Sequence, residues 1–318
     1  MNKQRTFIIG DRWVYFKIYT GYKTADFILT HTIFPLAQEF LQKKLIDNWF
    51  FIRYTDPQFH IRVRFHVAEK DNITSIIDHF NNGIQYYIDS DLVWKLQTDT
   101  YQRELERYSV EFIEYSEQLF SLSSEMICKI IALDEVRVDE DLRWLSGLKM
   151  TDRLLTDFEY SLQDKINLFN KLQETYGNEF GITTDFKRQF GQKYRTEKHR
   201  IEKFLDKATE QDHEHATVLY PIFESSEKSK EIIKEIRNKI TESEIKNSFN
   251  LTYRILFESL DDLLSSYIHM ALNRLFRTQQ NIHELILYDY LFRYYNSLAE
   301  RQKAEMQKAE SRKEEAGA

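Results

Sequence analysis

Hydrophobic and polar positions alternate through the first hundred residues, and the period of the alternation changes several times. Four segments rich in aromatic and β-branched residues are predicted strands. They are residues 13–21, 48–56, 58–67 and 92–101. Residues 24–45 and 72–88 instead have the apolar spacing of helices. The resulting order predicts the ferredoxin-like β-α-β-β-α-β motif, a four-stranded antiparallel sheet with two crossing helices.

Two signals lie inside the predicted helices. Pro35 predicts a kink or break in the first helix, because proline cannot donate a backbone hydrogen bond. Asn82-Gly83 predicts that the second helix ends there, since glycine favours the residue that follows a helix.

One predicted strand carries an unusual row of cations. In "FHIRVRF", the residues at Phe59, Ile61, Val63 and Phe65 form an apolar row, and alternate positions point to the opposite face. We expect the apolar row to face the helices, which leaves an open face rich in aromatic and basic side chains. That face is expected to carry Trp13, Tyr15, Lys17, Tyr19, Phe51, Arg53, His60, Arg62 and Arg64. Neighbouring like charges are costly unless an anion lies on them, so this row predicts an anionic ligand or partner.

The remainder of the chain is predicted to be helical. Candidate helices are residues 103–133, 141–158, 161–177, 184–208, 225–241, 253–276 and 282–298, with a loop at 212–221. We therefore expect an α+β protein, with a sheet region at 1–102 and a mostly α-helical region at 103–300 that packs on it within one catalytic domain. The charged stretch 301–318 is expected to be a disordered tail.

Composition narrows the class of protein. Of 318 residues, 42% are hydrophobic and 30% are charged, which indicates a folded globular chain. The net charge of -7 disfavours general nucleic-acid binding, because affinity for phosphates needs clustered cations. The single cysteine, Cys128, excludes an internal disulfide and lies in a helical stretch as a small apolar residue. No stretch has the apolar length of a membrane span or signal peptide, so we expect a cytoplasmic protein without membrane partners.

Common catalytic motifs are missing from the sequence. There is no GxGxxG, GxxxxGK[ST], HExxH, CxxC or GxSxG pattern, so no nucleotide, metal or other cofactor is expected. Three groups of residues remain, and each has an ordinary structural alternative. The first is Arg53 with His60, Arg62 and Arg64, which acidic residues elsewhere could neutralise.

The second group lies in "TYQRELERY". A helix there would place Arg103 and Arg107 on one face, beside Glu104, and the alternative is ordinary surface pairing. The third lies in "SSYIHMALNRLF", where His269 and Asn273 share a helix face. The alternative for His269 is a hydrogen-bonded core histidine.

Together these groups suit one kind of chemistry. Arginines bind carboxylates with paired hydrogen bonds and stay charged while stabilising an enolate. A histidine can move one proton near neutral pH. This set therefore fits the binding of a carboxylate and proton transfer.

The same segments carry a resemblance to a known family. "WVYFKIYTG", "FFIRYTDPQFHIRVRF", "TYQRELERY" and "SYIHMALNRLF" resemble, in this order, the signature segments of the C-terminal domain of class I lanthipeptide dehydratases, also found alone in thiopeptide-type bacteriocin biosynthesis proteins. The resemblance covers the chain to about residue 300. It implies catalytic roles for Arg64, Arg107 and His269. The substrate-binding residues implied or grouped with them are Arg53, His60, Arg62, Arg103, Glu104, Asn273 and Arg274.

The chain departs from the family directly after one residue of this set, Arg107. The family commonly has Arg-Tyr-Gly-Gly where this chain has "RYSV", residues 107–110. Without these glycines, the backbone beside Arg107 is expected to differ from that of the family.

The resemblance implies a reaction and partners. In this family the domain eliminates glutamate from glutamylated Ser or Thr of a ribosomal precursor peptide, leaving dehydroalanine or dehydrobutyrine. The anion on the arginines would then be a carboxylate of the glutamyl group. The implied partners are the glutamylated precursor peptide, a separate tRNA-dependent glutamylating protein and a possible cyclase.

Two alternatives stay open. The same fold is used by enzymes that form the six-membered nitrogen heterocycle of thiopeptides by cycloaddition of dehydrated residues. A non-catalytic module that binds RNA or peptide on its aromatic and basic sheet is the alternative of a different class, although the RNP1 pattern is missing.

Overall fold

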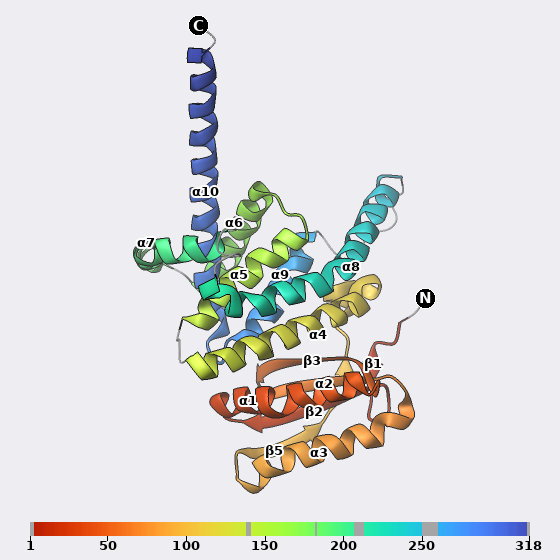
Figure 1. The fold of residues 1–318 in the computed structure, drawn as a ribbon. Helices are drawn as coiled ribbons and strands as arrows, with labels where there is room; N and C mark the ends of the chain where they lie inside the picture. Colours follow the sequence, from red (N-terminus) through yellow and green to blue (C-terminus); the bar gives the residue numbers. More distant parts are fainter. Residues whose placement is uncertain (1–2, 138–140, 182, 207–212, 250–259, 317–318) are drawn as a thin grey trace. The chain divides into compact units, whose positions relative to one another are not determined.

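The computed structural model describes residues 3–137, 141–181, 183–206, 213–249 and 260–316 (Figure 1). The chain forms two compact units. The first is Met1–Arg143 with Thr217–Gln280, and the second is Trp144–Ala216 with Asn281–Ala318. Helices that follow the sheet pack on it within the first unit. The expected division into a sheet region and a helical region near residue 102 stays a prediction. All the predicted site residues lie in the first unit.

The predicted four-stranded antiparallel sheet is confirmed. Its strands are β2 (Trp13–Thr20), β3 (Ile46–Thr55), β4 (Phe59–Val67) and β5 (Val93–Thr98). Their order is β3-β4-β2-β5, which is the order of the ferredoxin-like motif. A two-stranded ribbon, β1 (Thr6–Phe7) with β6 (Tyr101–Gln102), was not predicted.

Helices cover one face of the sheet, as expected (Figure 1). They are α1 (Tyr22–Ile28), η1 (Leu29–Ile33), α2 (Phe34–Gln42) and α3 (Ile73–Asp89), with a short 3-10 turn, η2 (Lys70–Asn72), before α3. Phe80 of α3 stacks on Phe16 at 3.8 Å between ring centres, and Phe40 of α2 contacts Phe65 edge-on. The disturbance predicted at Pro35 takes the form of the wide π turn η1, which accommodates the missing backbone donor.

The predicted end of the second helix at Asn82-Gly83 was wrong, since α3 continues to Asp89. Gly83 has a packing role instead. A Cβ atom there would lie 2.9 Å from Cδ1 of Leu36 and 3.1 Å from Cγ2 of Thr32. Glycine therefore allows the helices to approach closely.

The placement of Phe51 and Arg53 on the open face was also wrong. Phe51 lies opposite Val63 and Arg53 lies opposite Ile61, so both side chains point toward the helices. The error arose because residues 49–52 are all apolar, and an unbroken apolar run does not reveal which positions face the core.

The opposite face of the sheet is only partly open. Trp13, Tyr15 and Tyr19, which we expected to form an exposed recognition surface, are each buried. Tyr101 of β6 contacts Trp13 at 5.3 Å between ring centres, and His60 stacks on Tyr19 at 4.6 Å. The aromatic residues therefore form a second core that surrounds the cations.

Helices α4 (Leu105–Arg137) and α9 (Leu260–Leu275) seal the outer edge of β3. The amide of Phe51 donates to Oγ of Ser124 at 3.2 Å, and the carbonyl of Phe51 accepts from Nε of Arg274 at 2.7 Å. The side-chain amide of Asn273 accepts from the backbone N–H of Arg53 and donates to its carbonyl, both at 2.9 Å. An edge strand would otherwise expose these groups, so the Asn-Arg pair has a structural function.

The second unit is helical. It contains α6 (Leu162–Glu179), α7 (Thr184–Leu205), most of α5 (Leu142–Asp157) and nearly all of α10 (Gln280–Ala316). Where we expected a disordered tail, residues 301–316 continue α10, and those at 301–312 are exposed. Their Ala, Glu, Lys and Gln content favours helix.

The predicted loop at 212–221 was wrong from residue 213 on. Helix α8 (His213–Phe249) includes Pro221, and the neighbouring Val218, Leu219 and Ile222 are buried. Packing of these side chains favours the helix despite the proline. The beginning of the predicted helix 253–276 lies outside the described residues. Among the described helices, none has the length and apolar character required to cross a membrane.

Candidate functional site

Arg64 is the centre of the candidate site. It lies on β4 directly opposite Tyr15 on β2 and Phe50 on β3, and it is only 6% exposed. Its guanidinium carbon lies 4.3 Å from the ring centre of Tyr15, 4.9 Å from that of Tyr101 and 5.1 Å from that of Phe50. Its Nε and Nη1 are buried and have no hydrogen-bond partner among the described residues. Burial lowers the pKa of Arg64, and Tyr15 and Tyr101 partly oppose this effect.

Arg274 is a second buried arginine without a carboxylate partner among the described residues. Its Nε donates to the carbonyl of Phe51, its Nη1 donates to the carbonyl of Met270 at 3.0 Å, and its guanidinium lies over the ring of Phe120. Nη2 is buried without an acceptor. Burial lowers the pKa of Arg274 to about 9, and the like charge of Arg64 adds to the lowering. The two cations therefore interact unfavourably in a place from which water is excluded.

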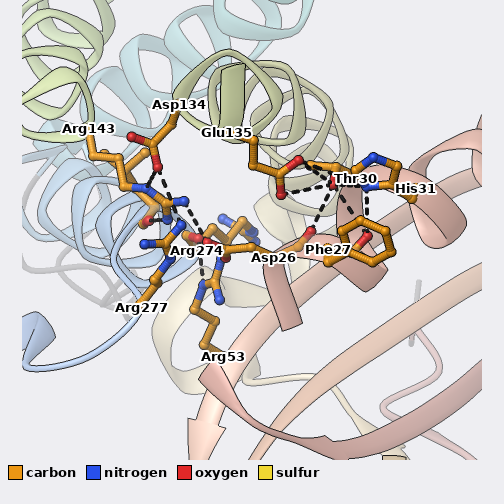
Figure 2. Close-up of polar contacts among 11 residues, drawn as sticks. Asp26, Phe27, Thr30, His31, Arg53, Asp134, Glu135, Arg143, Arg274 and Arg277 are labelled. Atoms are coloured by element: carbon orange, nitrogen blue, oxygen red, sulfur yellow. Dashed lines mark hydrogen bonds and ion pairs between the residues drawn. The ribbon is translucent and has the colours of Figure 1, made fainter. Parts of the chain in front are cut away.

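Other buried arginines are neutralised, which makes this pair distinctive. Figure 2 shows the clearest case, a cluster around Asp26 of α1. The Asp26 carboxylate, 1% exposed, accepts from Nη2 of Arg53 and Nη2 of Arg143, both at 2.5 Å, and from Nε of Arg277. Asp134 accepts from Nε of Arg143 at 2.7 Å. Burial alone would raise the pKa of Asp26, but the arginines outweigh it and hold that pKa below its ordinary value.

Arg53 and Arg103 therefore have structural partners. Nη2 of Arg103 donates to Oε2 of Glu117 at 2.6 Å and its Nε donates to Oε1 at 2.7 Å, a bidentate pair buried at the ribbon of β1 and β6. Arg53 contacts Asp26 on the helix-covered side of the sheet. Their predicted binding of substrate stays a prediction, and the structure gives each the environment of a fold-stabilising ion pair.

Arg62 is half-buried and forms the more open side of the site, and His60 beside it is buried. The guanidinium of Arg62 lies 3.5 Å from the ring centre of Tyr54, and its Nε donates to Nε2 of His60 at 3.0 Å. Nδ1 of His60 lies 2.9 Å from the carbonyl of Gln58, so a neutral imidazole satisfies both contacts. Burial lowers the pKa of His60. His60 thus orients Arg62 as a neutral acceptor.

Arg107 and Glu104 lie where the chain enters α4. They form an exposed pair with 3.5 Å between Nε and Oε2. The next residue but one, Ser109, interrupts the helix with φ 52° and ψ 166°. Its Oγ accepts from the amides of Glu111 and Phe112, so Ser109 starts a new helical segment as an N-cap. Ser109 therefore adopts a backbone conformation suited to glycine, and the "RYSV" sequence keeps a turn that glycines favour.

His269 is half-buried on α9, one helical turn before Asn273. Its Nδ1 lies 3.3 Å from Nε2 of Gln280, which also donates to the carbonyl of His269 at 3.1 Å. The sequence analysis did not identify Gln280, since a glutamine in a polar turn carries no distinguishing signal. The expected proximity of His269 to Arg62, Arg64 and Arg107 stays a prediction. Besides burial, the charge of Arg62 lowers the pKa of Arg64 and the charge of Glu104 raises it, and the charge of Arg64 lowers the pKa of Arg274.

The chain is similar to known proteins in sequence and in fold. Residues 13–295 match the family model described as "Lantibiotic biosynthesis dehydratase C-term". The subtilin biosynthesis protein SpaB of Bacillus subtilis is 25% identical over 171 residues, which cover 53% of this chain and 16% of SpaB. The chain thus spans a small part of that relative's length.

Three solved structures are similar in fold. The tRNA-dependent lantibiotic dehydratase MibB from Microbispora sp. 107891 has a TM-score of 0.71 at 18% identity, covering 95% of this chain and 29% of MibB. TsrL has a TM-score of 0.64 at 13% identity, covering 90% and 94%. TbtD, the pyridine synthase from thiomuracin biosynthesis, has a TM-score of 0.60 at 13% identity, covering 90% and 99%. The family match over most of the sequence establishes that this chain belongs to the lantibiotic dehydratase C-terminal domain family.

Proposed function

We propose that this protein eliminates glutamate from glutamylated Ser or Thr residues of a ribosomal precursor peptide, and so forms dehydroalanine or dehydrobutyrine. The observation that carries the proposal is the pair Arg64 and Arg274, two buried cations without a carboxylate partner among the described residues and with buried N–H groups left unpaired. Such a pair is costly in the free protein, and a bound carboxylate would relieve the cost. The free carboxylate of a glutamyl group has the required charge and geometry.

The arginines also suit the chemistry of the step. A base takes the Cα proton, and the electron pair of that C–H bond forms the Cα=Cβ bond. The Cβ–O bond breaks with its electron pair going to the oxygen, so glutamate leaves as a free carboxylate. The net reaction releases one proton to solvent. Negative charge develops on the peptide carbonyl oxygen during the step, and fixed guanidinium groups in a dry site stabilise it without reorganisation. His269 supplies a side chain that can exchange or donate a proton.

The implied partner is a separate protein that attaches glutamate in a tRNA-dependent reaction. MibB is described as a tRNA-dependent dehydratase, and this chain corresponds to 29% of its length. We propose that the glutamylated peptide, made elsewhere, is the substrate here, and that no nucleotide, metal or redox cofactor takes part.

The experiment is mass spectrometry of a precursor peptide incubated with purified protein. The unmodified precursor should stay unchanged, and the glutamylated precursor should lose glutamate and become dehydrated. Arg64→Ala and His269→Ala should each slow this step by roughly 100- to 1,000-fold, as expected for loss of one fixed donor. Arg12→Ala, which removes an exposed arginine paired with Glu69 at 3.6 Å, is the control and should keep the wild-type rate.

Two outcomes would overturn the proposal. Full dehydration by both Arg64→Ala and His269→Ala would reject the role of the site. A wild-type product with a new heterocycle and a released leader segment would instead assign the protein to cycloaddition.

A further inference from the structure

Three aromatic rings surround the guanidinium of Arg64, and they differ in the polar atoms that they carry. Phe50 has no polar atom on its side chain. The hydroxyl of Tyr101 donates to Oε1 of Glu117 at 2.8 Å, so the protein itself uses it. The hydroxyl of Tyr15 forms no hydrogen bond among the described residues, although a buried tyrosine usually has such a partner. In the part of the chain that the structure describes, Tyr15 is therefore the ring beside Arg64 that has a donor left for a ligand.

The register of the sheet places Tyr15 among the cations. It lies directly opposite Arg64 in the ladder of β2 and β4, and Lys17, two residues further on, lies opposite Arg62. Side chains two positions apart on a strand share a face, so all four point to the same face of the sheet. The centre of the Tyr15 ring lies 4.3 Å from the guanidinium carbon of Arg64 and 5.9 Å from Nζ of Lys17. An anion that contacts Arg64 on this face consequently lies next to Tyr15.

The protonation of Tyr15 suits a hydrogen-bond donor. Burial raises the pKa of Tyr15, and the positive charges of Arg64, Arg62 and Lys17 partly oppose the rise. The pKa stays above its ordinary value of 10, so the phenol keeps its proton at neutral pH. A protonated phenol beside cations can donate to a bound anion, and it is not the base that takes the Cα proton.

We propose that the Tyr15 hydroxyl donates a hydrogen bond to the carboxylate that Arg64 binds. The inference rests on the proposed function, which makes this carboxylate part of the glutamyl group and then of the released glutamate. Arg64 supplies the charge, and Tyr15 supplies a directional donor beside it. Because the contact is made to substrate and product alike, it contributes to binding more than to the chemical step.

The direct test is the affinity for sodium glutamate, measured by isothermal titration calorimetry at constant ionic strength in the wild type and in Tyr15→Phe. Phenylalanine keeps the ring beside Arg64 and removes only the hydroxyl. The dissociation constant should rise by roughly 10- to 100-fold, the usual effect of losing a hydrogen bond to a charged group. Tyr86→Phe, the same exchange at an exposed tyrosine of α3, should leave the affinity unchanged.

A second readout observes the hydroxyl in the wild-type protein. Tyrosine is labelled with ¹³C at Cζ, the atom that carries the hydroxyl, and the Tyr15 signal is identified by its loss in Tyr15→Phe. If that variant does not fold, the signal is identified by its change in Arg64→Met, which removes the guanidinium beside the ring. Sodium glutamate should shift the Tyr15 signal more than sodium chloride of the same ionic strength does, and the Tyr86 signal should stay in place.

Kinetics with the glutamylated peptide separate binding from a general structural effect. Tyr15→Phe should raise KM by roughly 10- to 100-fold with little change in kcat, as expected for a contact made equally in the ground state and the transition state. A fall in kcat with unchanged affinity for glutamate would contradict this assignment.

The remaining outcomes distinguish this inference from the proposed function. Equal affinity for glutamate in the wild type and Tyr15→Phe, no affinity in the wild type, or a Tyr15 signal that glutamate leaves in place would each overturn the inference. An affinity for glutamate that depends on Tyr15, in a protein that leaves the glutamylated peptide unchanged, would support the contact and overturn the proposed function alone.

Discussion

The first unit contains two groups of arginines, and they differ in whether carboxylates of the protein neutralise their charge. Around Asp26, three arginines contact two carboxylates, and these contacts connect α1, β3, α4, the beginning of α5 and the segment after α9 (Figure 2). On the sheet's other face Arg64 contacts aromatic rings, and at the outer edge of β3 Arg274 contacts Phe120 and backbone carbonyls. Neither has a carboxylate partner among the described residues. The groups are joined at Arg53, whose Nε donates to the carbonyl of Arg274 at 2.8 Å.

The difference separates arginines whose charge is neutralised within the protein from arginines whose charge has no carboxylate partner among the described residues. A buried ion pair has its counter-charge in the protein, and removal of either partner leaves an isolated charge. A buried cation without a counter-charge reduces stability and is kept where a bound anion supplies the charge. Burial and sequence neighbours do not distinguish the two groups, and only the partners do.

The largest effect is expected for Asp26→Asn. This change keeps the shape of the side chain. Among the described residues it leaves Arg53 without a carboxylate partner and leaves Arg143 and Arg277 with Asp134. The free energy of unfolding in urea should fall by about 3–5 kcal/mol. Asp78→Asn, at an exposed position of α3, should change it by less than about 0.5 kcal/mol. A loss at Asp26 as small as at Asp78 would show that the cluster is not what holds these elements together.

The same carboxylate predicts a pH dependence. Because the folded pKa of Asp26 lies below its ordinary value of 3.8, its stabilising contribution is fully present above that value and is lost as the pH falls through the folded pKa. Urea titrations below about pH 4 should therefore show a steeper loss in the wild type than in Asp26→Asn. Parallel curves for the two proteins would contradict this assignment.

Substitution by methionine should change the free energy of unfolding in opposite directions at Arg64 and Arg103. Arg64→Met removes an unpaired buried charge and keeps the contact with the rings, so the free energy of unfolding should rise by about 1–4 kcal/mol while elimination is lost. Arg103→Met leaves Glu117 buried without its partner and should destabilise the protein. Urea denaturation of the two variants in parallel checks the comparison, and destabilisation of similar size in both would break it.

A smaller effect is expected for Ser109→Gly. Glycine adopts the positive φ of residue 109 without strain. The exchange also removes the N-cap hydrogen bonds to Glu111 and Phe112, and replacing an N-cap serine by glycine costs only about a few tenths of a kcal/mol. The net result should be an increase of about 1 kcal/mol in the free energy of unfolding, measured in urea. A decrease would show that the cap matters more than the backbone conformation.

The sheet could be predicted from the sequence because its strands show clear alternation and its helices a clear change of period. The alternation of apolar and basic residues in "FHIRVRF" predicted correctly which side chains of β4 face the helices. The same reasoning failed for β3, where the apolar run 49–52 is compatible with either face, since one side packs on helices and the other on Tyr101 and Phe120. No pattern in the sequence predicts that α4 and α9 pack on the outer edge of β3.

The site was predictable only as a set of residue types. Arg53 and Arg64 look alike in the sequence, and their difference depends on Asp26, a residue that appears as an ordinary polar position in a predicted helix. The family resemblance selected Arg64, Arg107 and His269 but could not show which arginines are neutralised. Gln280 acquires its position through a turn whose geometry has no signature in the sequence.

The central claim, that the Arg64 and Arg274 pair is completed by a carboxylate ligand, is tested most directly by unfolding in urea with added sodium glutamate, the proposed product. The wild type should gain stability relative to sodium chloride of the same ionic strength, about 2.7 kcal/mol when glutamate reaches 100 times its dissociation constant. Arg64→Met, which starts more stable, should gain nothing beyond the salt control. An equal gain in both proteins, or none in either, would contradict the account.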